Sequence, residues 1–451
     1  MTSMNVVTDS QFMLRRSSAW VPDAGHAKLL TALVWFLALL MILPEGLDYD
    51  RLANSHAPES GSAISRLLWL FLFLFSGVAI LWRSRLAWQV LRCLNPYLIG
   101  FLVLAGASVL WSIDPALSLR RLFRLTAIVS ACLAFTLYKW HLRRFQDALR
   151  PLITYVLVTS LVFGLWSPTL AIHQEQSAEL LGAWHGLFSH KNGFGAFGCL
   201  GALFWLHAWL SGETRWKNAG LGVGISVTCI LLSRSSTALV ATILVSVFFL
   251  FTIRAKPATQ RWLPVAIVGI TIATLVVALA VINVIPGLSV LLAPVTALTG
   301  KDNSLTGRTE IWSIVLEHIQ QHELLGTGYG AYWRPVASVY ADSGIFLARM
   351  RSFYPGSAHN GYLDITNDLG CVGLLVLIAF LISHVFRSLR SARRQWPQSM
   401  LHLGIFFEQC VTNLSESHWF NSTSVFLVVV TMSSISLSRS EVQERFENAY
   451  L

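Results

Sequence analysis

The sequence predicts an all-α polytopic membrane protein with about twelve transmembrane helices and one large outer loop. Of its 451 residues, 54% are hydrophobic and only 12% are charged, whereas soluble domains contain about a quarter charged residues. Long apolar runs recur along the whole chain, and one long stretch between residues 286 and 360 interrupts them. The composition therefore excludes an ordinary soluble protein.

Twelve apolar segments approach the length that a membrane-crossing helix needs, which is about 20 residues for a bilayer core of about 30 Å. Two of them are so close together that they predict a hairpin near residues 233–236. The first ends without a small-residue cleavage site, so we expect it to be retained as a span. The predicted spans lie near residues 26–43, 65–82, 94–111, 122–138, 151–172, 192–210, 218–233, 236–253, 263–285, 361–386, 400–415 and 420–438.

The positive charges divide unequally between the two sides of these spans. If the N-terminus is cytoplasmic, 21 of the 33 Lys and Arg residues fall in inner segments and 12 in outer ones. Inner loops of membrane proteins are enriched in Lys and Arg, so we expect both termini to be cytoplasmic. The net charge of +10 follows from this topology and gives no reason to expect a nucleic acid partner.

Three parts can be distinguished along the chain. Residues 1–285 hold predicted transmembrane helices 1 to 9, residues 286–360 form the large outer loop, and residues 361–451 hold helices 10 to 12 and a cytoplasmic tail. Connections longer than about 15 residues are usually functional or structured. We therefore expect catalytic side chains in this loop.

The six cysteines predict packing rather than chemistry, because they are scattered and mostly lie within apolar runs. The sequence has no CxxC pair and no cysteine with a histidine at metal-ligand spacing. It also lacks a GxxxxGK[ST] motif for binding ATP. We expect neither a metal nor a cofactor.

The loop contains a helical signal followed by a glycine-rich stretch. Ile311, Trp312, Val315 and Ile319 recur at helical spacing. GTGYGAYW (326–333) follows, and its GxGxG spacing after a helix argues against a dinucleotide-binding loop, so we expect a flexible connection. Most aromatic residues of the loop are expected to form its small core; they are Trp312, Tyr329, Tyr332, Trp333, Tyr340 and Tyr354.

Several motifs, in this order along the chain, resemble those of the O-antigen ligase and polymerase family of bacterial membrane glycosyltransferases. The main ones are GRTEIW (307–312), LLGTGYGAYW (324–333) and SAHNGYLDITNDLGCVGLLVLI (357–378). The supporting ones are WSIDPALSLRR (111–121), GLFSHKNGFG (186–195), SRSSTAL (233–239) and NLSES (413–417). The SHKN and NLSES variants are most similar to the exopolysaccharide polymerase branch typified by succinoglycan production proteins.

The resemblance implies a GT-C-like glycosyltransferase of the bacterial inner membrane with a mostly helical periplasmic loop. Its donor would be a polyprenyl pyrophosphate-linked oligosaccharide, used without a nucleotide sugar and without an essential metal. Family ligases use arginines that contact the donor pyrophosphate and a loop histidine at the reaction centre. Carried over by motif, the loop arginine matches Arg308 and the histidine matches His359.

Arginines suit this chemistry because the leaving pyrophosphate gains charge as the glycosidic bond breaks, and bidentate guanidinium contacts stabilise that charge. Arg308 is the first candidate for binding the donor pyrophosphate. Arg234 is a second, although the motif can also be aligned so that Ser236 occupies the family's basic position. Arg120 and Arg121 are further candidates, with anchoring at the membrane interface as the alternative.

His359 suits proton abstraction from an acceptor hydroxyl, which we favour, or hydrogen bonding to a phosphate. Asn360 and Tyr362 would orient it or line the path of the acceptor. The sequence contains no convincing glycosidase pair of carboxylates, which disfavours hydrolysis.

Three more residues near the outer surface are candidates for binding or orienting the acceptor. His190 and Lys191 would bind the acceptor glycan or a phosphate; the alternative is a helix N-terminal turn packed under the loop. Glu416 would pair with an outer arginine or serve as an alternative base.

We predict a polymerase that joins lipid-linked repeat units on the periplasmic face, in contact with membrane lipids and with a chain-length co-polymerase as a candidate partner. An O-antigen ligase, which transfers the glycan to lipid A core, is the nearest alternative. A secondary transporter or a lipid-linked glycan flippase is the alternative from another class. Such proteins usually need polar residues deep in their spans, and here these are few.

Overall fold

The computed structural model describes residues 23–44, 63–174, 180–281, 308–334 and 355–449. Within these ranges the regular structure is helical, apart from one isolated bridge between Ile172 and Trp184. In chain order the helices are α2 (Asp23–Ile42), α4 (Ala63–Trp82), α5 (Ser84–Arg92), α6 (Pro96–Ala107), the 3₁₀ turn η2 (Ser108–Leu110), α7 (Pro115–Thr136), α8 (Arg144–Trp166), α9 (Pro168–Ala171), α10 (Lys191–Leu210), α11 (Trp216–Ser233), α12 (Ser236–Thr252), α13 (Pro257–Gln260), α14 (Leu263–Val281), α16 (Arg308–Gln321), α18 (Gly361–Ala392), α19 (Trp396–Thr412) and α20 (Val425–Ala449).

Each of the twelve predicted apolar segments overlaps one of these helices. Six helices in the described ranges are long and apolar enough to cross a membrane by themselves, or seven if the bent pair of α5 with α6 and η2 counts as one span. These long apolar helices define a polytopic membrane protein. The total of twelve crossings stays a prediction.

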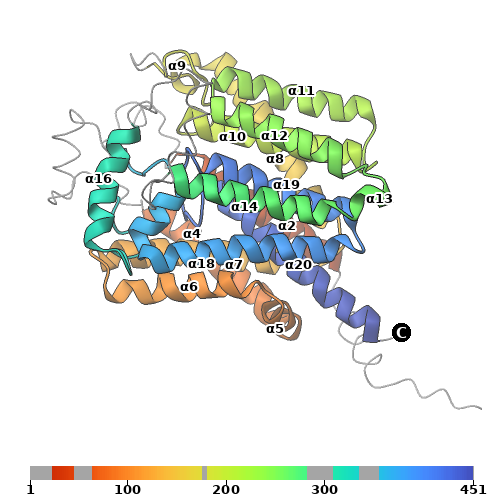
Figure 1. Ribbon diagram of the computed structural model, residues 1–451, viewed down its shortest axis with the longest axis horizontal. Helices are drawn as coiled ribbons and strands as arrows, with labels where there is room; N and C mark the ends of the chain where they lie inside the picture. Colours follow the sequence, from red (N-terminus) through yellow and green to blue (C-terminus); the bar gives the residue numbers. More distant parts are fainter. Residues whose placement is uncertain (1–22, 45–62, 175–179, 282–307, 335–354, 450–451) are drawn as a thin grey trace, which may run out of the picture.

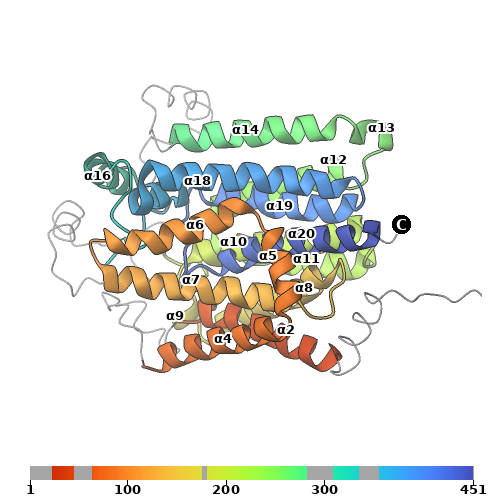
Figure 2. The same ribbon diagram turned by 90° about the horizontal axis from the view of Figure 1, so that it is seen from below.

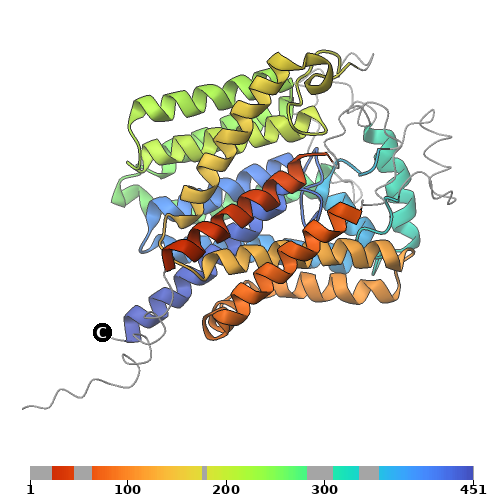
Figure 3. The same ribbon diagram turned by 180° about the vertical axis from the view of Figure 1, so that it is seen from behind.

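The long helices run roughly side by side, and α16 lies across one end of the bundle (Figure 1). In the view from below, α14 lies at one edge of the bundle and α4 near the opposite edge (Figure 2). From behind, α2 and α4, in red and orange, cross the near face (Figure 3). We call the end of the bundle that carries α16 the loop end, and the opposite end the far end.

The interior of the bundle is built around α10, α19 and α20. The apolar windows of α10 and α20 are 78% and 83% buried, whereas that of α4 is only 22% buried. The exposed side chains of α4 are large and apolar, including Leu67, Phe71 and Leu74, as expected for a lipid-facing surface. The packing role predicted for the cysteines is confirmed for five of the six, which are buried, whereas Cys371 is exposed.

One helix begins earlier than predicted. We expected a span from residue 122, but α7 begins at Pro115 because Asp114 caps it: the Asp114 side chain accepts a hydrogen bond from the Leu117 N–H at 3.0 Å. Arg120 and Arg121 therefore lie within the helix rather than in the connection before it.

The predicted hairpin between α11 and α12 is confirmed. α11 ends at Ser233, Arg234 adopts a left-handed backbone with φ of 51°, and Ser235 caps α12 by accepting from the Ala238 N–H at 3.4 Å. This turn lies at the loop end.

The helix predicted inside the long loop is α16. Its predicted apolar face is confirmed, since Ile311, Trp312, Val315 and Ile319 are all buried. The Trp312 indole N–H donates to the Ala358 carbonyl at 2.8 Å, which ties α16 to the chain just before α18. Of the predicted aromatic core, Trp312, Tyr329, Tyr332 and Trp333 are buried, and Tyr340 and Tyr354 lie outside the described residues.

Candidate active site

The carboxylate of Glu416, in the segment between α19 and α20, contacts side chains from three other parts of the chain. Its Oε1 accepts from Asn192 Nδ2 at 2.6 Å and from Arg308 Nη2 at 3.3 Å, and its Oε2 lies 3.5 Å from His359 Nδ1. We call these four residues the Glu416 cluster. The structure thus brings together Arg308, His359 and Glu416, all nominated from the sequence.

Backbone geometry fixes the position of His359. Its φ is +47°, in the left-handed region that a non-glycine residue rarely adopts. Its N–H donates to Ser357 Oγ at 3.3 Å, and the next residue, Asn360, begins α18 as its N-cap. Strain of this kind persists only where surrounding structure imposes it, and it concentrates at functional sites.

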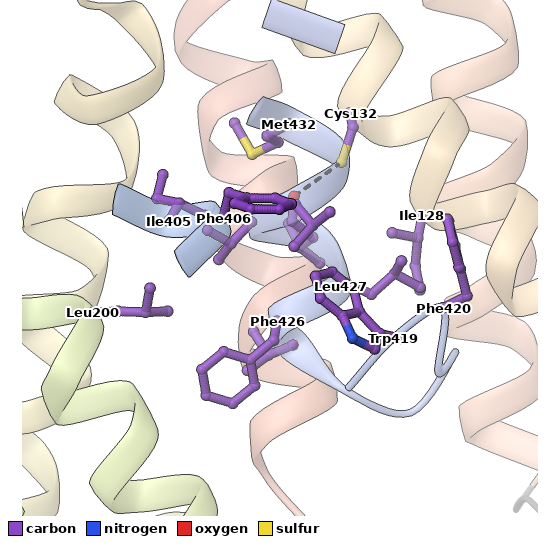
Figure 4. Close-up of a cluster of buried hydrophobic side chains, with 14 of the residues drawn as sticks. Ile128, Cys132, Leu200, Ile405, Phe406, Trp419, Phe420, Phe426, Leu427 and Met432 are labelled. Carbon is purple, nitrogen blue, oxygen red and sulfur yellow. Dashed lines mark hydrogen bonds between the residues drawn. The ribbon is translucent and has the colours of Figure 1, made fainter. Parts of the chain in front are cut away.

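Aromatic packing anchors the segment that carries Glu416. Trp419 and Phe420 lie in a buried apolar cluster with Phe426 and Leu427 of α20 (Figure 4). The Asn413 side chain accepts from the N–H groups of His418 and Trp419, both at 2.8 Å. The carboxylate therefore projects from a well-packed turn rather than from a loose loop.

The surroundings of Glu416 keep it ionised. Burial alone would raise its pKa, but the His359 imidazole, whose Nδ1 lies 3.5 Å from Oε2, and the Arg308 guanidinium hold the pKa well below its ordinary value. Glu416 is therefore an anion at neutral pH. An anion next to the His359 imidazole stabilises the imidazolium that forms when His359 accepts a proton.

His190 lies near His359, with its ring 6.2 Å from that of His359 and 5.3 Å from that of His173. Burial lowers the pKa of His190 to about 4, so it is neutral at neutral pH. His190 Nδ1 accepts from the Asn192 N–H at 3.3 Å and so caps α10, while the Lys191 N–H donates to His173 Nε2 at 3.2 Å. These contacts correspond to the helix N-terminal turn that we had kept as the alternative role of His190 and Lys191.

Asn360 and Tyr362 stabilise the first turn of α18, which follows His359. Asn360 Oδ1 accepts from the N–H groups of Tyr362 and Leu363, both at 3.1 Å, which caps α18. The Tyr362 hydroxyl donates to the Cys410 carbonyl at 3.2 Å, and its side chain is only 1% exposed. Both residues therefore orient His359 indirectly, through the start of α18.

Among the described residues, the side chains that contact Glu416 do not include Arg234. Its side chain is exposed and donates to the Leu181 carbonyl at 3.0 Å. The neighbouring turn does approach the cluster, because Ser415 Oγ donates to Thr237 Oγ1 at 2.8 Å.

The glycine-rich segment 326–333 is fixed against α18, which corrects our expectation of a flexible connection. α18 is broken at Gly370, which has φ of 64°, and a side chain there would clash with the Leu324 backbone. Backbone N–H and C=O groups on both sides of the break form hydrogen bonds with the segment. The groups left unpaired by the break in α18 therefore find partners in the loop. The bonds run from Thr327 N–H to Asn367 O, Gly328 N–H to Asp368 O, Cys371 N–H to Glu323 O and Val372 N–H to Leu324 O.

Arg121 supports the same segment from α7. Its guanidinium donates to the Gly330 carbonyl at 2.6 Å and to the Trp333 carbonyl at 3.0 Å. Asp368 Oδ2 accepts from the Gly330 N–H at 2.8 Å. These contacts give Arg121 a positioning role, where the sequence had suggested pyrophosphate binding or interfacial anchoring.

Arg120 lines a largely apolar pocket of about 410 Å³ between α4 and α7, which Arg121 also lines. Arg66 and Arg124 also line this pocket, together with Trp69 and Phe123. Apolar walls with guanidinium groups suit a lipid that has an anionic head group. We call this pocket the α4–α7 pocket.

Some residues of the site were not nominated from the sequence. Asn192 lies within the SHKN motif. Asp364 and Asp368 lie four residues apart in the motif of residues 357–378, a spacing that places both on one face of a helix. Within the described ranges, no group of three or more His, Cys, Asp and Glu residues could hold a metal ion.

Comparison with known families agrees with this geometry. The family described as O-Antigen ligase matches residues 221–378, which include Arg234, Arg308 and His359 but not Glu416. The long apolar helices define a polytopic membrane protein, and part of its chain, residues 221–378, is similar to the O-antigen ligase family. The family resemblance predicted from the motifs is confirmed.

The chain is also similar to a particular polymer-producing protein, the exopolysaccharide production protein ExoQ of Rhizobium meliloti (strain 1021). The two are 28% identical over 327 residues, which cover 68% of this chain and 69% of ExoQ. Together the two similarities support a membrane polysaccharide polymerase or ligase role.

Proposed function

We propose that this protein is a polymerase of lipid-linked oligosaccharide repeat units, acting on the periplasmic face of the bacterial inner membrane. Its donor would be a growing glycan on polyprenyl pyrophosphate, and its acceptor the non-reducing end of another lipid-linked unit. The observation that carries the proposal is the Glu416 cluster, where a guanidinium and an imidazole from two parts of the outer loop meet one carboxylate. The similarity to an exopolysaccharide production protein supports the choice of polymer.

In the proposed reaction, His359 takes the proton of the acceptor hydroxyl as that oxygen attacks the anomeric carbon of the donor. His359 Nδ1 faces Glu416, which leaves Nε2 to accept the proton. The bond between the anomeric carbon and the pyrophosphate oxygen breaks, and the pyrophosphate leaves with the electron pair. Attack opposite the leaving group inverts the anomeric carbon.

Arg308 would stabilise the leaving pyrophosphate. It makes one 3.3 Å contact to Glu416 and keeps 19% of its side chain exposed, so part of the guanidinium stays available to an incoming anion. Asn192 shares Oε1 of Glu416 with Arg308. The carboxylate thereby holds the arginine and the histidine in one orientation before substrate arrives.

The α4–α7 pocket would hold the polyprenyl carrier near its pyrophosphate. Arg66, Arg120 and Arg124 supply positive charge beside apolar walls. In this proposal Arg120 binds the carrier lipid, and Arg308 acts on the bond that breaks.

The test uses the full chain in proteoliposomes with lipid-linked repeat units from the producing strain. The wild type should form a ladder of polymers, and the H359A and R308A variants should form none while remaining folded. The E213Q variant, changed at the far end, should form polymer at the wild-type rate per folded molecule. Wild-type polymer length in both loop variants would refute the proposal, as would glycan transport without polymer formation.

An O-antigen ligase is the second candidate, favoured by the family description of the match to residues 221–378. A deletion strain separates the two functions. Single repeats accumulating on the carrier lipid indicate a polymerase, whereas long carrier-linked polymer with uncapped lipid A core indicates a ligase.

A further inference from the structure

A small polar cavity of about 60 Å³ lies beside the Glu416 cluster. Its walls come from the glycine-rich segment, the start of α18 and the segment between α19 and α20. Two of its wall residues contact the backbone next to the cluster: the His359 N–H donates to Ser357 Oγ, and the Asn360 N–H donates to Ser417 Oγ at 3.2 Å. The cavity therefore shares wall residues with the backbone segment that positions His359.

Two carboxylates one helical turn apart line this cavity, and they differ in how well they are satisfied. Asp364 Oδ1 accepts from Trp333 Nε1 at 2.7 Å and from the Ala358 N–H at 3.1 Å, and the same N–H lies 3.2 Å from its Oδ2. Asp368 uses only Oδ2, which accepts from the Gly330 N–H at 2.8 Å. Its Oδ1 is buried and has no hydrogen-bond partner among the described residues.

A buried carboxylate oxygen without a donor is costly, and such atoms usually mark a missing ligand or water. Asp368 is only 7% exposed, so a donor for Oδ1 has to come from a group that enters the cavity. The cavity has room for roughly four waters at about 15 Å³ each. That space is enough for two or three hydroxyl groups, but too small to enclose a sugar ring.

The chemistry of the walls selects a neutral, hydroxyl-bearing ligand. Arg121 also lines the cavity, but its guanidinium donates to the Gly330 and Trp333 carbonyls. The two carboxylates offer acceptors rather than donors, which disfavours an anion such as pyrophosphate, while the hydroxyl groups of a sugar are natural donors to a carboxylate oxygen. The indole rings of Trp333 and Trp419 also line the cavity, and aromatic faces pack against the apolar faces of sugar rings.

We propose that this cavity binds the hydroxyl edge of the acceptor sugar, with Asp368 Oδ1 accepting a hydrogen bond from one hydroxyl. The rest of the ring would lie outside the cavity and present its reactive hydroxyl to His359. The inference rests on the proposed function, because it names the part of the site that receives the acceptor.

The test is binding of the delipidated repeat-unit oligosaccharide, released from its carrier by mild acid, to the full chain in nanodiscs. The D368N variant isolates the vacant oxygen, because an asparagine can still accept from the Gly330 N–H while its NH₂ group replaces Oδ1. Saturation-transfer NMR should show wild-type binding with a Kd near ~1 mM. D368N should bind roughly tenfold or more weakly, because the oxygen that accepts from the sugar hydroxyl is replaced by an NH₂ group that cannot accept.

The control variant is D147N, changed at an exposed aspartate of the far end, which should bind as the wild type does. Equal melting temperatures of wild type and D368N should show that the fold is kept. Wild-type affinity in D368N would overturn the proposal, as would absence of saturable binding by the wild type. The H359A variant should keep oligosaccharide binding even though it forms no polymer, so failure of this inference and failure of the proposed function give different results.

Discussion

Two clusters at opposite ends of the bundle are built from the same kinds of side chain. At the far end, Glu213 accepts from Arg150 at 2.9 Å and from Gln146 at 3.1 Å, and lies 4.0 Å from His207. At the loop end, Glu416 makes the equivalent contacts with an arginine, an amide and a histidine. Composition alone would assign both clusters the same role.

The two clusters differ in access and in backbone. The His207 side chain is 1% exposed and lies inside α10, where its Nε2 contacts the Pro397 carbonyl. The His359 side chain is 24% exposed, follows a turn and has a left-handed backbone. A substrate can reach His359 and not His207. The far-end cluster therefore joins helices, and only the loop-end cluster meets the geometric requirement for catalysis.

The largest expected effect on the rate comes from replacing His359, with a substitution of His207 as its counterpart. H359A should lower the rate of polymer formation by about 10²- to 10⁴-fold, because it removes the proposed general base. H207Q should leave the rate per folded molecule unchanged and lower the melting temperature. Initial rates in proteoliposomes and thermal unfolding of both variants would check this; an H207Q rate as low as that of H359A would remove the distinction between the clusters.

Replacing Arg308 and Arg150 by lysine should give a smaller difference in rate between the two clusters. R308K should lower the rate about 10- to 100-fold, because a lysine keeps the charge but cannot make bidentate contacts with pyrophosphate. R150K should affect only stability, by no more than about 1 kcal/mol. Rates measured at saturating donor, with folded protein quantified by size-exclusion chromatography, would separate these effects.

Replacing the two carboxylates by glutamine should have opposite main effects, on stability at Glu213 and on rate at Glu416. E213Q should lower the free energy of unfolding by about 2 kcal/mol, since it weakens a buried ion pair and its hydrogen bonds. E416Q should cost less stability, because its cluster is more exposed, yet it should slow polymer formation. Denaturation of both variants in detergent would measure the difference, and equal losses of stability would contradict the comparison.

The smallest expected effect is a pH dependence that the loop end contributes through His418. Burial lowers the pKa of this histidine from 6.5 to about 4, so between these values the unfolded chain binds a proton that the folded chain does not. The resulting stability is complete above pH 6.5 and is lost as the pH falls toward 4. H418Q should therefore have a flatter melting temperature over this range than the wild type, whereas H322Q, at an exposed histidine, should follow the wild type.

The sequence predicted the helices, and it nominated three residues that the structure brings together, Arg308, His359 and Glu416. Apolar segments twenty residues long predict spans, and motif order pointed to Arg308 and His359. The sequence could not show that Glu416 lies between these two residues, because the contact to Arg308 joins positions 108 residues apart. It also missed the break at Gly370, since a single glycine in an apolar run gives no sign of the loop that packs against it.

Glu416 lies between the last two helices, α19 and α20, so it is synthesised after Arg308 and His359. A nascent chain emerges with its arginine and histidine first, and the anion that holds them is translated only after α19. The turn that carries Glu416 can pack only after α20 has been translated, because Trp419 and Phe420 pack with Phe426 and Leu427 of that helix. A ribosome-bound fragment that ends before α19 therefore lacks the carboxylate of the Glu416 cluster, however completely its earlier helices have entered the bilayer.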